Sequence, residues 1–154
     1  MSYIRYKNNN LFVESVSVKS LASKLSTPFY LYSEGNIIKN YRSFSNNFRK
    51  SNPLICFSVK ANSNIQILKV LKKMGSGADV VSGGELLKAI KSGIKPNKIV
   101  FSGVGKTEEE IKLAIRKNIL LINVYIGMFH FRIGSAWSKW YLSRNARLFG
   151  RLFN

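Results

Sequence analysis

Residues 54–81 read LICFSVKANSNIQILKVLKKMGSGADVV, and two kinds of pattern follow one another in this stretch. Residues 54–59 are an apolar run with the length of a buried strand, and residues 65–74 carry apolar side chains at helical spacing. Gly75 marks the end of that helix, and residues 78–81 form a second apolar run. The stretch therefore predicts two parallel strands joined by a crossover helix.

The same pattern continues toward the C-terminus. Two further helices are expected after Ser82 and Thr107, each with a glutamate at capping-box spacing, and two further strands at 99–102 and 120–124. Four strand–helix units predict an α/β fold whose apolar, non-alternating strands are covered on both faces. A doubly wound sheet and the amino-terminal half of a (β/α)8 barrel of the TIM type both fit. Helices of similar length after every strand favour the barrel, which would be incomplete because a whole barrel needs roughly 250 residues.

The composition indicates a single domain without disulfides or membrane spans. The chain has 154 residues, of which 45% are hydrophobic, so it can form a core. Its one cysteine, Cys56, excludes an internal disulfide and a multi-cysteine zinc site, and we expect no metal. There is no apolar run of about 18 residues and no signal peptide at the start. We therefore expect a cytoplasmic protein that does not enter the membrane.

The composition changes where the predicted sheet ends. All seven acidic residues precede the segment 125–154, which carries five basic residues, both tryptophans and no acid. We therefore divide the chain into an opening segment (1–32), a partial barrel (33–124) and this atypical basic and aromatic tail (125–154). The opening segment ends in a short predicted strand at 28–32, and the next segment begins with a predicted helix at 36–48.

Lys60 directly follows the first predicted strand of the sheet, and chemistry in parallel α/β folds gathers at the carboxyl ends of the strands. A lysine whose stem leaves a dry interior has a lowered pKa, and its neutral amine can react with a carbonyl cofactor. A lysine at a strand end can also extend into solvent without any such role. The residues alone leave both interpretations of Lys60 open.

Several segments resemble a known family. Residues 57–64, FSVKANSN, are similar to the Y-A-V-K-A-N-S-N signature of diaminopimelate decarboxylases, which are alanine-racemase-like, fold type III pyridoxal-phosphate-dependent decarboxylases. Residues 77–86 and 99–107 continue the match in order, and residues 27–32 resemble the family's T-P-x-Y-V-Y strand. The resemblance covers about residues 25–124 and only the amino-terminal part of the family.

The resemblance implies a role for three residues. Lys60 would be the catalytic residue and would carry pyridoxal phosphate covalently, with Asp79 and Glu85 beside the cofactor. The spacing of Glu85 after Ser82 equally fits a helix cap. The implied reaction is the decarboxylation of meso-diaminopimelate, a small amino-acid substrate, to L-lysine. The full-length form would be a homodimer.

Other features of the family are missing from the sequence. They are the glycine-rich phosphate-binding loop, the E-P-G-R segment and the carboxyl-terminal β domain, so we expect a truncated, aggregation-prone and inactive fragment. Residues 125–154 fit a shifted reading frame or a misjoined sequence. Alternatively, residues 127–135, GMFHFRIGS, resemble the family's later G-x-H-x-H-I-G-S strand with Arg132 in place of a histidine.

Three other functions are compatible with the sequence. A related decarboxylase acting on ornithine or arginine would have the same fold. A non-catalytic pyridoxal-phosphate carrier would also have the same barrel, but its smaller lysine motif fits this sequence less well. The formal charge of +18 could instead serve binding to nucleic acid or to an anionic surface. Because the bases before residue 125 are spread over every predicted helix and loop, we do not expect nucleic acid as a partner.

Overall fold

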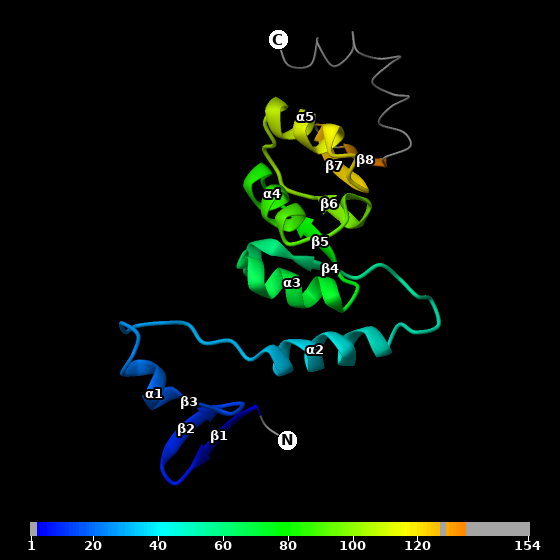
Figure 1. Ribbon diagram of the computed structural model, residues 1–154. Coiled ribbons are helices and arrows are strands. Elements are labelled where there is room, and N and C mark those ends of the chain that lie inside the picture. Colours follow the sequence, from blue (N-terminus) through cyan, green and yellow to red (C-terminus); the bar gives the residue numbers. More distant parts are fainter. Residues whose placement is uncertain (1–2, 127–128, 135–154) are drawn as a thin grey trace. The chain divides into compact units, whose positions relative to one another are not determined.

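The computed structural model describes residues 3–126 and 129–134, which fall into two compact units divided after Ser51 (Figure 1). The first unit combines a small antiparallel sheet with two helices. Its elements are β1 (Ile4–Lys7), β2 (Asn10–Val13), β3 (Val16–Ser17), α1 (Val18–Ala22) and α2 (Glu34–Asn46).

The first unit confirms one predicted element and contradicts another. The helix expected at 36–48 is α2, which begins after its N-cap residue Ser33. The strand expected at 28–32 does not form, and Tyr30 within it is 90% exposed. An aromatic run becomes a strand only where a neighbouring strand supplies hydrogen-bond partners, and β1, β2 and β3 pair only with one another.

A single carboxylate fixes the start of α2 within this unit. Glu14 Oε1 accepts a hydrogen bond from the Ser33 hydroxyl at 2.6 Å and another from the Gly35 N–H at 2.8 Å. These two hydrogen bonds, the Ser33 one foremost, hold the pKa of Glu14 below its ordinary value. The acid therefore supports the first turn of the helix, where backbone N–H groups have no partner in the helix itself.

The second unit is a five-stranded sheet with helices between its parallel strands (Figure 1). The strand order is β4-β5-β6-β7-β8, in which the first four strands are parallel and β8 is antiparallel to β7. In chain order its elements are β4 (Cys56–Ser58), the 3-10 helix η1 (Val59–Ala61), α3 (Ile65–Lys73), β5 (Gly77–Val80), α4 (Gly83–Lys91), the 3-10 helix η2 (Pro96–Lys98), β6 (Ile99–Phe101), α5 (Glu108–Arg116), β7 (Leu121–Ile126) and β8 (Phe129–Gly134).

The order of the parallel strands distinguishes the two predicted architectures. Each parallel strand lies beside the one that follows it in sequence, so every crossover moves one strand in the same direction. Right-handed crossovers that always step the same way place their helices on one side of the sheet. α3, α4 and α5 lie along one side of the strands (Figure 1), whereas a doubly wound sheet has helices on both sides. The second unit is therefore an arc of a (β/α)8 barrel, as predicted.

Side chains along the strands alternate between two faces, which contradicts the expectation of strands covered on both faces. Val80 and Phe101 are fully buried and belong to the core with residues of α3, α4 and α5. Their neighbours Asp79 and Ser102 are only partly buried. A barrel arc has an outer face under its helices and an inner face toward the barrel axis, so the side-chain period of two is visible.

Two glycines allow close approach between backbones of neighbouring segments. A Cβ at Gly103 would lie 2.3 Å from the Val81 carbonyl oxygen, and one at Gly77 would lie 2.3 Å from the Lys98 carbonyl oxygen. Because the overlapping atoms belong to the backbone and not to a flexible side chain, any residue with a Cβ at these positions would displace the backbone. Glycine at these positions sets the spacing of the sheet near β5 and β6.

The segment that the sequence sets apart as a tail begins within the sheet. β7 continues to Ile126, and β8 pairs with it along its whole length. Within this ladder Arg132, which takes the place of a histidine in the motif resemblance, is the backbone partner of Asn123. Residues 135–154, with both tryptophans, lie outside the described residues, so the two interpretations of the tail stay predictions.

Candidate active site

Four polar residues from neighbouring strands share the inner face of the sheet near its carboxyl edge. Ser58 ends β4 and pairs with Asp79 of β5, Ser102 follows β6, and Asn123 lies in β7. Paired residues of parallel strands point to the same face, and so do residues two apart along a strand. The register from β4 to β7 therefore places all four on the face opposite the helices. We call these four residues the polar row.

The hydrogen bonds of the polar row are incomplete. The Ser102 hydroxyl donates a short hydrogen bond to Asp79 Oδ1. Ser58 Oγ and Asn123 Oδ1 are buried, and neither has a hydrogen-bond partner within the described part of the chain. Buried polar atoms in proteins are nearly always hydrogen-bonded. The inner face therefore suits a polar ligand that would satisfy them.

Lys60 lies in η1, the 3-10 turn that begins directly after β4. The strand ends at Ser58, one residue earlier than predicted, and the lysine side chain is exposed. Of the two interpretations of Lys60, this exposure fits the one in which the side chain extends into solvent, because the 3-10 turn removes Lys60 from the pleat of the strand. The exposed amine is accessible to an aldehyde. Since η1 contacts both β5 and α4, the fold brings Lys60 near the elements that carry Asp79 and Glu85.

Local hydrogen bonds explain the polar residues that follow Lys60. Asn62 Oδ1 accepts a hydrogen bond from the Asn64 N–H at 3.0 Å, and Asn64 caps α3 by accepting from the Gln66 N–H at 2.8 Å. Lys88 of α4 donates to the Ser63 hydroxyl at 2.9 Å. The loop after Lys60 is thus held at three points, which restricts where the lysine can move.

Glu85 closes the loop between β5 and α4. Ser82 Oγ accepts a hydrogen bond from the Glu85 N–H at 3.2 Å, as expected for an N-cap. The Glu85 carboxylate accepts from the Val81 N–H at 2.9 Å. The contact lies one residue before the N-cap, so Glu85 supports the start of α4 without forming the reciprocal capping box that its spacing indicated. Its predicted place beside a cofactor stays a prediction.

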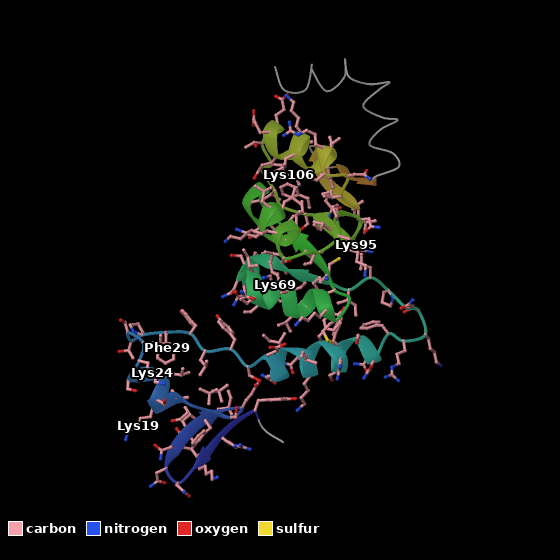
Figure 2. The ribbon with its side chains drawn as sticks, viewed as in Figure 1. Lys19, Lys24, Phe29, Lys69, Lys95 and Lys106 are labelled. Carbon is pink, nitrogen blue, oxygen red and sulfur yellow. The ribbon has the colours of Figure 1, made fainter. Side chains whose placement is uncertain are left out.

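Lys106 is a residue whose role the sequence analysis did not identify. Its Nζ donates to the carbonyl oxygens of Gly103 and Asn123, the second at 2.6 Å, and lies 5.1 Å from the ring centroid of Phe101. Burial lowers the pKa of Lys106, and the Glu110 carboxylate partly opposes this shift. Figure 2 shows Lys106 near the carboxyl edge of the sheet, in the loop before α5. Of the two lysines, Lys106 is therefore the one that is partly buried, whereas Lys60 is exposed.

The residues of this edge fit pyridoxal phosphate. The cofactor needs an accessible amine for its aldehyde and polar side chains for its ring and phosphate oxygens. Lys60 supplies the amine, Asp79 supplies a carboxylate, and Ser58 supplies a buried hydroxyl with no partner in the described chain. Among the described residues no group of three His, Cys, Asp or Glu side chains is arranged to hold a metal ion. The same part of the chain has no helix with the length and apolar character of a membrane span.

Comparison with known proteins gives consistent matches. The pyridoxal binding domain model of the pyridoxal-dependent decarboxylases matches residues 34–127, which is more than half of the chain. The diaminopimelate decarboxylase of Aquifex aeolicus is 46% identical over 122 residues, covering 79% of this chain and 29% of that protein. The Helicobacter pylori J99 enzyme of the same name is 49% identical over 106 residues, covering 69% of this chain and 26% of that protein.

A solved structure agrees with these sequence matches. The crystal structure of diaminopimelate decarboxylase from M. jannaschii in complex with L-lysine superposes with a TM-score of 0.75 at 38% identity, covering 79% of this chain and 29% of that one. The motif resemblance and the partial-barrel fold predicted from the sequence are confirmed by these matches. This chain spans about 30% of the length of the relatives that it matches.

Proposed function

The chain belongs to the pyridoxal-dependent decarboxylases, and we propose that it is the cofactor-bearing part of a diaminopimelate decarboxylase, which converts meso-diaminopimelate to L-lysine. Pyridoxal phosphate is the cofactor of this family. The observation that carries the proposal is the position of Lys60. It follows β4 at the carboxyl edge of the sheet, beside the polar row, within the segment that the pyridoxal-binding model matches.

Each predicted site residue would have a separate task. Bound pyridoxal phosphate supplies an electron sink for the carbanion that forms when a carboxylate is lost. Lys60 would hold the cofactor through its amine. Asp79, oriented by its hydrogen bond from Ser102, would present its carboxylate to the cofactor. Glu85 would keep the β5–α4 loop closed beneath it through the Val81 N–H.

The extent of the match defines what the chain would do alone. We propose that residues 33–124 bind the cofactor, and that turnover needs segments present in the roughly threefold longer relatives, of which this chain spans about 30%. The isolated chain would then bind pyridoxal phosphate without decarboxylating the substrate. The full-length form would act as a homodimer in the cytoplasm.

Reductive trapping tests the position of the cofactor. The full chain is incubated with pyridoxal phosphate, reduced with borohydride and digested, and the labelled peptide is identified by mass spectrometry. We expect the label on Lys60, and we expect Lys60→Arg to lose it. Lys69→Arg, on the following helix, is the matched control and should keep it. A label spread evenly over the many surface lysines, or one concentrated on Lys106, would exclude the proposed role of Lys60.

The substrate is tested by competition for the same lysine. A substrate amine displaces the lysine from the cofactor, so its addition before reduction protects Lys60 from labelling. Meso-diaminopimelate, ornithine and arginine are compared at equal concentration. We expect the strongest protection from meso-diaminopimelate. Stronger protection by ornithine or arginine would assign the chain to a decarboxylase of that substrate class.

A further inference from the structure

The hydroxyl of Ser58 is unusual among the buried serine hydroxyls of the part of the chain that the structure describes. It ends β4 on the inner face, and its Oγ is buried without a hydrogen-bond partner among the described residues. By contrast, Ser92 Oγ donates to the Ala89 carbonyl at 2.6 Å, and Ser76 Oγ lies 2.8 Å from the Gly77 carbonyl oxygen. Leaving a buried hydroxyl unpaired costs folding free energy. Packing among the described residues therefore does not explain why position 58 carries a hydroxyl.

The surroundings of Ser58 indicate what could use this hydroxyl. Its backbone partner is Asp79 on β5, and neighbouring strands lie about 4.8 Å apart. Lys60 follows two residues later, in the turn that continues the same strand. The next residue, Val59, is fully buried. A group attached to the Lys60 amine and resting on the inner face would thus be close to Ser58 and Asp79 together.

We propose that the Ser58 hydroxyl is a hydrogen-bond donor to the pyridoxal phosphate carried by Lys60. This inference rests on the proposed function. The cofactor offers acceptors in its phenolic oxygen, its ring nitrogen and its phosphate, and the serine offers a donor that the described chain leaves unused. The role belongs to this chain in particular, because alanine stands at this position in the family signature to which residues 57–64 are similar.

The proposal predicts that Ser58→Ala has effects of opposite sign on folding and on binding. Without cofactor, the substitution removes a buried unpaired hydroxyl, so the unfolding midpoint should stay the same or rise. With cofactor, it removes a hydrogen bond, so the dissociation constant should rise about 5- to 10-fold. A serine that served only the fold would instead lower the unfolding midpoint when replaced.

The experiment compares the full-length wild-type chain with Ser58→Ala and Ser92→Ala. Pyridoxal phosphate is titrated by its visible absorbance, and urea unfolding is followed without cofactor by far-ultraviolet circular dichroism. Ser92→Ala is the matched control, because it removes a buried hydroxyl that has a partner at the end of α4. We expect Ser92→Ala to lower the unfolding midpoint and to leave the dissociation constant of the folded chain unchanged. Ser58→Ala should instead raise the dissociation constant and leave the unfolding midpoint unchanged or higher.

Two results would overturn the inference. One is a dissociation constant for Ser58→Ala within twofold of the wild type while reductive trapping still labels Lys60. The other is a fall in the unfolding midpoint of Ser58→Ala as large as that of Ser92→Ala. Failure of the proposed function is distinguishable, because the wild-type chain itself would then show no label on Lys60.

Discussion

Lys106 connects two strands of the sheet through a single ammonium group. It donates to the Gly103 carbonyl after β6 and to the Asn123 carbonyl of β7, over the face of the buried Phe101 ring. The ladder between β6 and β7 ends at the pair of Phe101 and Ile122. Beyond that pair, the two hydrogen bonds of Lys106 hold the chain after β6 against β7.

Replacing Lys106 with methionine should therefore destabilise the second unit. The substitution keeps the apolar stem but removes the ammonium donors, and two carbonyl groups lose a partner, which costs about 1 to 3 kcal/mol. Urea unfolding of the full chain measures this loss. Lys112→Met is the control, because Lys112 is exposed in an i,i+4 pair with Glu108, and such a pair is worth at most about 1 kcal/mol. Equal losses in the two variants would show that the carbonyl contacts of Lys106 contribute nothing.

Site residues that depend on local sequence could be predicted, and those that depend on the sheet could not. The N-caps Ser82 and Thr107 follow from residues three positions apart. The exposure of Lys60 depends on where β4 ends, and the burial of Lys106 depends on which strand lies beside its loop. Neither fact is encoded within a few residues, so the sequence analysis left the exposure of Lys60 open and did not identify Lys106.

At the scale of secondary-structure elements, Glu110 joins the amino ends of two helices. One of its carboxylate oxygens accepts from the Gly83 N–H of α4 at 2.6 Å, and the other accepts from the Thr107 N–H at 3.1 Å. The second contact completes the capping box of α5 that the sequence predicted. The first contact spans 27 residues and was not predicted, because no local pattern reports which helix lies next to α5.

The capping role of Glu110 should make the second unit sensitive to acid. The hydrogen bonds from the Gly83 N–H and then the Thr107 N–H lower the pKa of Glu110 in the folded chain. The stabilisation is therefore complete above the ordinary carboxyl pKa and is lost as pH falls through the lower folded-state value. The difference in unfolding free energy between wild type and Glu110→Gln should shrink over that acidic range.

Urea unfolding at a series of pH values measures this difference. Glu109→Gln is the matched control, because Glu109 lies in the same first turn of α5 but has no hydrogen bond to α4. We expect the Glu109 variant to differ little from wild type at every pH. A Glu110 effect that persisted undiminished in acid would contradict the assignment.

At the scale of the whole molecule, the thiol of Cys56 reports whether the second unit is folded. Burial raises the pKa of Cys56, and the Asp79 carboxylate raises it further. A thiol reagent reacts with the thiolate, so at pH 8 the native chain should react more slowly than the same chain in urea. Ellman's reagent measures both rates. Equal rates would mean that β4 is not assembled with β5 in the isolated chain.

The arrangement of the barrel arc was largely predictable, because apolar runs and amphipathic helices follow one another at regular spacing from Leu54 to Val124. The barrel was favoured over the doubly wound sheet by the similar helix lengths and by the resemblance, but only the strand order shows the direction of each crossover. The run at 28–32 has the composition of a strand but no partner strand in its unit. Amino-acid composition does not show whether a partner strand is present.

The alternation along β5 and β6 separates stability from chemistry within the same few residues. Val80 and Phe101 point under the helices, whereas Asp79 and Ser102 take no part in that core. Residues on the inner face, toward the barrel axis, can therefore change to suit a new ligand. Residues on the outer face, under the helices, continue to stabilise the fold. Alternate residues of one strand can therefore be substituted for different purposes, either to change the ligand or to change stability.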